Sequence, residues 1–203
     1  AFSKKYEAPI VKDGNTNALK ELNNHVKPFI LRRTKVEVAK DLPAKIEHRI
    51  SVEMTEGQKK IYLAYLKDAK GELEEDVREK GFNKSKFKVL SILTRLRQIC
   101  CDPSTFIENY NGGSGKMEAL DEILGNSLEQ GHRILIFSQF TRVLKNIASR
   151  LDAKEIGYMY LDGSTKAEKR VKMVKNFNEG ESKIFLISLK AGGTGIKDRK
   201  SVV

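Results

Sequence analysis

Three apolar runs in the second half of the chain, each ending in small or hydroxyl residues, most constrain what this sequence can fold into. The runs occur within Ile134–Phe140, Tyr160–Thr165 and Ile184–Gly195. Amphipathic helix patterns lie between them, and this alternation of strand and helix predicts a parallel sheet with right-handed crossovers. Because parallel strands end at the same edge of a sheet, the residues that follow the runs are expected to line one surface.

A loop from Asp102 to Gly115 separates this part from two helix patterns that precede it. The first helix starts after a capping box of Thr55 and Gln58 and ends at Gly81. The second runs from about Ser85 to Cys101, with Phe87, Leu90, Leu93, Leu96 and Cys100 on one face. Together they predict a helical hairpin.

Weaker patterns complete the predicted elements. Alternating apolar residues from Ile46 to Met54 predict a strand, and helical spacing continues from Leu19 to Ile30. Thr165 and Glu168 form a second capping box. The strands of the sheet are predicted at residues 133–137, 158–161 and 183–188, and its helices contain Met117–Leu128, Val143–Leu151 and Val171–Phe177.

The composition favours a folded protein with an anionic partner. The chain has 203 residues, of which 39% are hydrophobic and 32% charged, with a net charge of +11. The excess is spread over both halves, which suggests nucleic acid, although a soluble basic surface is the plainer alternative. No apolar run has the length of a membrane span. The adjacent cysteines, Cys100 and Cys101, lack metal-ligand spacing and fit a reducing, cytoplasmic setting.

Residues at the three strand ends are the candidate site. They offer hydroxyls, amides, backbone N–H groups and one lysine, which suit sequence-independent contacts to a phosphate backbone. An ordinary turn explains the first end equally well, and a plain capping box explains the second. The candidates are Ser138 and Gln139 at the first end, Gly163, Ser164 and Thr165 at the second, and Ser188, Lys190, Ala191, Gly192, Gly193, Thr194 and Gly195 at the third.

Two other chemistries are disfavoured by the residues present. The segment ending in Gly115-Lys116 lacks the first glycine and the final hydroxyl of a nucleotide-binding loop, so a connector capped by Ser114 is the better interpretation. The dinucleotide fingerprint does not fit the glycines after Ser188, where no helix is expected to follow. His25, His48 and His132 are scattered, and the sequence contains no self-sufficient hydrolytic centre and no metal site.

Several blocks of the sequence resemble the Swi/Snf family of helicase-like, ATP-dependent DNA translocases. The particular residues in these blocks are most similar to those of bacterial members. The resemblance covers about Phe2 to Ile196. The blocks are Leu31-Arg-Arg-Thr-Lys35, Asp41-Leu-Pro-Ala-Lys45, Leu96-Arg-Gln-Ile-Cys100, Gly115-Lys-Met117, Phe137-Ser-Gln-Phe140, Leu161-Asp-Gly-Ser-Thr165 and Leu189-Lys-Ala-Gly-Gly-Thr-Gly195.

The resemblance implies an incomplete RecA-like α/β lobe preceded by α-helical protrusions. It assigns residues 1–54 to the tail and protrusion of a first lobe, 55–113 to a second protrusion and connector, and 114–203 to a truncated second lobe. It implies contacts to double-stranded DNA by Ser138, Gln139 and residues 163–165, 188 and 190–192. Gly193, Thr194 and Gly195 would belong to the ATP cleft, and the parent enzyme would use ATP and Mg²⁺.

The sequence departs from the family after Ile196, where residues 197–203 replace the expected continuation, as in a truncated or frame-shifted end. Lacking the phosphate loop, the acidic box and the arginine finger, this chain is expected to have no catalytic residues, to hold no nucleotide tightly and to be inactive alone. It is expected to need the missing first lobe and to self-associate through unpaired sheet edges. The alternative is a non-enzymatic DNA- or protein-binding module. The expected location is cytoplasmic, at the bacterial nucleoid, or nuclear in a eukaryote.

Overall fold

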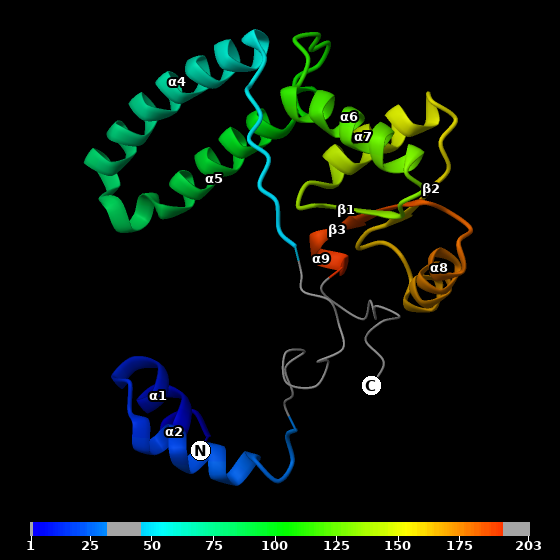
Figure 1. Cartoon of the computed structure of the whole chain (residues 1–203). Coiled ribbons are helices and arrows are strands. Elements are labelled where there is room, and N and C mark those ends of the chain that lie inside the picture. Colours follow the sequence, from blue (N-terminus) through cyan, green and yellow to red (C-terminus); the bar gives the residue numbers. More distant parts are fainter. Residues whose placement is uncertain (1, 32–45, 193–203) are drawn as a thin grey trace. The chain divides into compact units, whose positions relative to one another are not determined.

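The computed structural model describes residues 2–31 and 46–192 and divides the chain into two compact units, broadly residues 1–46 and 47–202 (Figure 1). We describe each unit by itself. The sequence blocks at 32–35 and 41–45, and the short helix predicted through Val38, lie outside the described residues. No described helix is long and apolar enough to cross a bilayer. The three-part division at residues 54 and 113 stays a prediction.

The first unit contains three short helical segments. They are a π-helix η1 (Ser3–Glu7), α1 (Ala8–Asp13) and α2 (Thr16–Val26). Asn15 caps α2 by accepting hydrogen bonds from the backbone of Asn17 and Ala18, which satisfies two N–H groups that the helix leaves without partners. Lys5 and Glu21 form an ion pair of 2.6 Å between the segments. The helix predicted from Leu19 is thus confirmed, although it ends at Val26.

The second unit begins with the helical hairpin of α4 (Glu56–Lys80) and α5 (Phe82–Cys101), as the sequence predicted. Both predicted signals at α4 are confirmed: the Thr55–Gln58 capping box starts the helix, and Gly81 with a φ of 77° ends it. The predicted face of α5 is wrong in part. Leu96 is buried, but Phe87, Leu90 and Leu93 are exposed.

A three-stranded parallel sheet follows the hairpin, with the strands in the order β1-β3-β2. The connections place helices on its two faces (Figure 1). The elements are η2 (Pro103–Thr105), α6 (Gly115–Glu129), β1 (Ile134–Ser138), α7 (Thr141–Asp152), β2 (Tyr158–Leu161), α8 (Ala167–Glu179), β3 (Ile184–Ser188) and α9 (Leu189–Gly192). The predicted α/β architecture is confirmed, with strand limits within one residue.

The central strand β3 is buried along its whole length. Ile184 and Leu186 belong to a core that includes α6 and α7, whereas Phe185 and Ile187 belong to a second core that includes α8 and α9. A strand that is apolar on both faces must be covered on both, which explains its continuous run of apolar residues. At the edge strand β1, Leu135 and Phe137 remain half exposed.

The strand predicted from Ile46 to Met54 is wrong. These residues form neither helix nor strand, and Ile46 and Ile50 are exposed. The apolar alternation suits an extended chain, but a strand also needs a partner for its backbone hydrogen bonds. Among the described residues, only β1, β2 and β3 pair in a sheet, and this segment is not next to any of them in the ladder.

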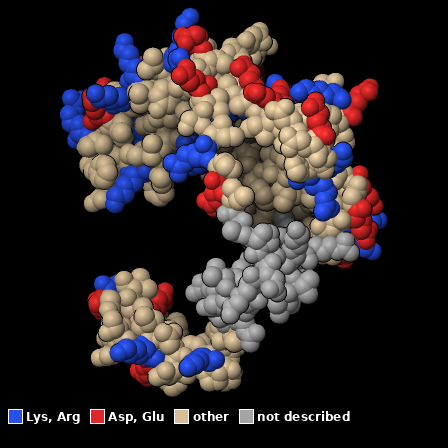
Figure 2. Space-filling model, viewed as in Figure 1, with Lys and Arg blue, Asp and Glu red and all other residues tan. Residues whose placement is uncertain are grey.

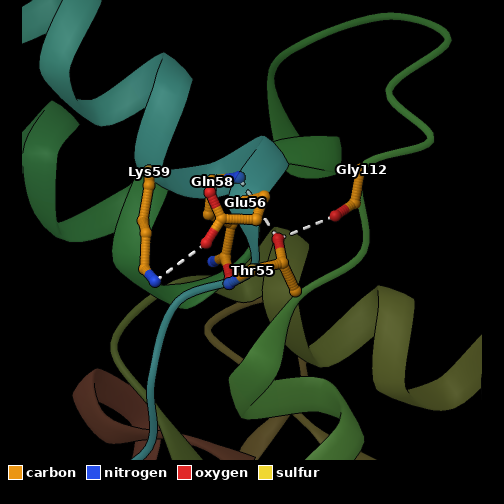
Figure 3. A network of polar contacts seen from close by, with 5 residues as sticks. All are labelled: Thr55, Glu56, Gln58, Lys59 and Gly112. Carbon is orange, nitrogen blue, oxygen red and sulfur yellow. Dashed lines mark hydrogen bonds and ion pairs between the residues drawn. The ribbon is translucent and has the colours of Figure 1, made fainter.

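A buried amide joins the hairpin to the α/β part. Gln58 is 1% exposed; its side chain donates to the carbonyl of Ile99 (2.9 Å) and accepts from the N–H of Gly115 (3.0 Å). Nearby, the Thr55 hydroxyl donates to the carbonyl of Gly112 at 2.7 Å (Figure 3). The start of α4, the end of α5 and the start of α6 are therefore held together by one polar network.

Packing around Gly115 shows why this junction needs a glycine. A Cβ there would lie 2.0 Å from the backbone oxygen of Glu53, a distance that no relaxation of a side chain could relieve. Ser114 caps α6 and donates to the carbonyl of Cys101 at 2.7 Å. The prediction of a capped connector, in place of a nucleotide-binding loop, agrees with this local structure.

We predict that replacing Gln58 by leucine lowers the free energy of unfolding by about 2–4 kcal/mol, because the Ile99 carbonyl and the Gly115 N–H would be buried without partners. Urea denaturation measures the change. Lys60→Ala, an exposed substitution on the same helix, is the control and should stay within about 0.5 kcal/mol. An unchanged midpoint for Gln58→Leu would contradict the role of this network.

Candidate nucleic-acid interface

The sheet brings the three predicted strand ends to one edge. Ser138 at the end of β1 is in register with Ser188 at the end of β3, and Leu161 of β2 is in register with Ile187. The loop that begins at Asp162 therefore leaves the sheet beside the end of β3. The expected juxtaposition is confirmed, because parallel pairing fixes which ends of the strands meet.

At the β1 end, the two candidate residues have different environments. The Ser138 hydroxyl accepts a hydrogen bond from the N–H of Phe140 at 3.1 Å, so it serves the turn into α7. Gln139 is exposed, and its side-chain oxygen accepts from Arg97 at 2.7 Å. Arg97 lies on α5 and was not among the predicted site residues. No local pattern could find it, since 42 positions separate the pair.

At the β2 end, an aspartate organises the turn. The Asp162 carboxylate accepts from the backbone N–H of Ser164 (2.9 Å) and from its hydroxyl (2.6 Å), while Gly163 and Ser164 are exposed. The predicted Thr165–Glu168 capping box is wrong. The Thr165 hydroxyl instead accepts from the N–H of Asp162 at 3.2 Å, and α8 starts one residue later than that box requires. The aspartate turn competes for the hydroxyl, as short polar side chains commonly do.

At the β3 end, the chain turns into the short helix α9, contrary to the expectation that no helix follows. Ser188 is 3% exposed and accepts from the N–H of Ala191 at 3.3 Å, and Ala191 is also buried. Both residues thus shape the turn, whereas Lys190 is exposed. A Cβ on Gly192 would lie 2.9 Å from Ile187, so this glycine lets α9 pack on the sheet. Gly193, Thr194 and Gly195 lie outside the described residues.

The exposed strand-end side chains carry mainly hydrogen-bond donors. Gln139, Ser164 and Lys190 are all exposed, and Asp162 is the one carboxylate in the three strand-end turns. Two hydrogen bonds from Ser164, first from its hydroxyl and then from its backbone, lower the pKa of Asp162 below the usual value of that side chain. The carboxylate therefore accepts hydrogen bonds within its own turn. Because the exposed side chains at this edge are mainly donors, the edge is suited to binding an anion.

The described part of the chain holds no cluster of side chains of the kind that ligates a metal ion. Among residues 2–31 and 46–192, no group of three or more His, Cys, Asp and Glu side chains could hold a metal ion. Each of the three histidines is exposed. The two cysteines are free thiols, and burial raises the pKa of Cys101.

A parallel sheet with helices on both faces and polar residues at its strand ends defines an α/β lobe with a candidate ligand surface at one edge. Two family comparisons agree with this class. The SNF2-related domain matches residues 1–105, and the helicase conserved C-terminal domain matches residues 115–198. The chain belongs to the SNF2-related family.

Curated relatives show how much of a longer protein this sequence corresponds to. The chain is 36% identical over 197 residues to "SWI/SNF-related matrix-associated actin-dependent regulator of chromatin subfamily A member 1" of Mus musculus, a match that covers 90% of this chain and 18% of that protein. It is 37% identical over 194 residues to "Nuclear protein STH1/NPS1" of Saccharomyces cerevisiae, covering 88% and 14%. The chain therefore spans less than a fifth of either relative.

Solved structures match both the sheet and the helical part. The Sulfolobus solfataricus SWI2/SNF2 ATPase core in complex with dsDNA is 32% identical with a TM-score of 0.63, covering 92% of this chain and 40% of that one. The C-terminal domain of the Sulfolobus solfataricus SWI2/SNF2 ATPase is 28% identical with a TM-score of 0.65, covering 76% and 68%. The RecA-like fold class expected from the sequence is thus confirmed.

The depressed pKa of Asp162 makes a prediction about stability and pH. Its carboxylate stabilises the fold above the unfolded-state pKa of about 4, and this contribution is lost as the pH falls through the lower folded-state pKa. Asp162→Asn should therefore lower the free energy of unfolding at pH 7, by less than about 1 kcal/mol at this partly exposed site, and make no difference at low pH. Urea denaturation at both pH values measures it, with Glu122→Gln, an exposed substitution in the middle of α6, as the control. A penalty independent of pH would contradict the assignment.

Proposed function

We propose that this chain is the DNA-contacting C-terminal part of an ATP-dependent double-stranded DNA translocase. The observation that carries the proposal is the edge where Gln139, Ser164 and Lys190 are exposed at three adjacent strand ends. Amide, hydroxyl and ammonium groups there can hold phosphate oxygens without reading bases. The similar Sulfolobus core was solved in complex with double-stranded DNA, which supports duplex DNA as the kind of partner.

Within this proposal, the residues of the edge divide into two roles. Gln139, Ser164 and Lys190, together with the exposed backbone at Gly163, contact the DNA backbone. Ser138, Thr165, Ser188, Ala191 and Gly192, which were also predicted as contacts, support these groups through the turns they form.

We further propose that ATP and Mg²⁺ bind in the complete enzyme, between this lobe and a first lobe that supplies the phosphate loop and the metal ligands. Bound there, the nucleotide would supply the energy for movement along DNA. Gly193, Thr194 and Gly195 are proposed for the coupling role. We propose that the protein is located with chromosomal DNA, in the nucleus or in the bacterial nucleoid. The Saccharomyces relative is named a nuclear protein. The predicted bacterial origin is not supported by these two relatives, which come from a mouse and a yeast.

The test is duplex DNA binding, measured by fluorescence anisotropy over a series of salt concentrations. We expect weak, sequence-independent binding with a steep dependence on salt. Lys190→Ala should weaken binding roughly two- to fivefold and lower the salt slope by about 1, and Ser164→Ala should weaken it less.

Lys183→Ala is the matched control, because this exposed lysine precedes the opposite end of the same strand. Loss of affinity in both lysine variants would mean that only net charge matters. Binding that neither Lys190→Ala nor Ser164→Ala changes would remove the edge from the DNA path and favour a binding module that uses another surface.

We also predict that the 203-residue chain alone hydrolyses no ATP in response to DNA, because its sequence contains neither a phosphate loop nor an arginine finger. A coupled assay of phosphate release, with and without duplex DNA, measures this. Turnover that copurifies with the chain and responds to DNA would show that this prediction is wrong.

Self-association remains a further proposal, and it is supported by the half-exposed Leu135 and Phe137 on edge strand β1. Sedimentation velocity over a range of concentrations tests it. A strictly monomeric profile at high concentration would count against it.

A further inference from the structure

An open groove of about 650 Å³ runs between α5 and the turn that leads from β1 into α7. Its volume falls in the range of sites that hold small ligands or a few peptide side chains. Phe87, Leu90 and Arg95 line it from the α5 side, and Phe106, Gln139 and Arg142 from the other. The strand-end surface assigned to DNA shares only Gln139 with this groove.

Three arginines in or beside the groove are held by neutral partners. Arg95 lies over the ring of Phe106, 4.5 Å from its centroid, and donates to the side-chain oxygen of Gln98 at 3.0 Å. Arg142 donates to the carbonyl of Thr105 at 3.0 Å. Arg97 donates to Gln139 at 2.7 Å. These contacts position the guanidinium groups, and within the described part of the chain none of the three arginines forms an ion pair with a carboxylate.

No carboxylate side chain lines the groove in the described structure. Helix α5 contains five basic residues and no acidic one, namely Lys84, Lys86, Lys88, Arg95 and Arg97. By contrast, Arg150, on the far part of α7, is paired with Asp121. Over the hairpin as a whole, where α4 adds its own acidic residues, Figure 2 shows Lys and Arg together with Asp and Glu.

The α5 end of the groove is apolar and uncovered. Phe87 is 85% exposed and Leu90 is 60% exposed, one turn apart on the helix. Large apolar side chains clustered at a groove and next to basic groups mark an interaction surface more often than isolated ones do. The same groove is therefore lined by apolar side chains at one end, Phe87 and Leu90, and by the basic side chains of Arg95 and Arg142 elsewhere.

We propose that this groove binds a short acidic peptide segment that carries a large apolar side chain. Its carboxylates would contact Arg95 and Arg142, because a guanidinium group can donate two parallel hydrogen bonds to one carboxylate. Its apolar side chain would cover Phe87 and Leu90. Duplex DNA fits less well, because its outer surface offers phosphates for the arginines and nothing apolar for the other end.

Fluorescence anisotropy with two labelled peptides and a short DNA duplex tests the proposal on the full 203-residue chain. The first peptide, about twelve residues long, alternates Asp and Glu with Leu and Phe; in the second, serine replaces every Leu and Phe. We expect the first to bind more tightly than the second. Binding of the first should weaken on the order of tenfold in the double variant Arg95→Ala/Arg142→Ala.

Exposed substitutions keep the test independent of folding. Phe87→Ser should weaken binding of the first peptide severalfold and leave the second unchanged, and a side chain that is 85% exposed contributes little to folding. The controls are Arg78→Ala and Leu63→Ser, exposed residues of α4 outside the groove, which should change nothing. Thermal melting by circular dichroism confirms that each variant is folded.

Three results would overturn the proposal. Equal affinity for the two peptides would mean that the groove binds anions in general and does not recognise the apolar side chains. Peptide binding that survives both the arginine and the Phe87 variants would place it elsewhere. Loss of duplex binding in the groove variants, with no binding of the first peptide, would assign the groove to DNA. The DNA assignment of Lys190 and Ser164 is tested separately, so either proposal can fail alone.

Discussion

The parallel pairing of β3 between β1 and β2 is the constraint on which the rest of the second unit depends. The strand is buried on both faces, so it can exist only if helices cover each side and strands flank each edge. That arrangement aligns the ends of all three strands. The surface proposed for DNA is thus a consequence of the strand pairing that buries the core. The exposed Gln139, Ser164 and Lys190 are positioned by the buried residues next to them in the chain.

The hairpin is attached to this lobe through polar groups that are taken out of water. Gln58 makes buried hydrogen bonds to two other segments, and an unsatisfied amide in that place would be costly. Such a network has few alternative geometries, unlike an apolar contact that can slide. It holds α5 beside the β1–α7 turn, which allows Arg97 to reach Gln139 and creates the groove between them.

The two capping boxes show where local patterns succeed and where they fail. Thr55 and Gln58 form theirs because the threonine hydroxyl can accept from the N–H of Gln58 while it donates to the carbonyl of Gly112. Thr165 does not, because Asp162 lies three residues earlier and draws both Ser164 and Thr165 into its turn. The apolar alternation from Ile46 to Met54 fails for another reason, since a strand exists only where a neighbour accepts its hydrogen bonds.

By itself, the sequence determined the alternation of helices and strands, the parallel sheet, the hairpin and the family, because these follow from periodicity and from short local motifs. Only the tertiary structure decided which strand-end residues face solvent and which support a turn, as the buried Ser188 and the exposed Lys190 show. It alone brought Arg97 to Gln139 and left Phe87 uncovered. The physical reason is that exposure and long-range contact depend on what packs against a residue, and the packing partners lie far away along the chain.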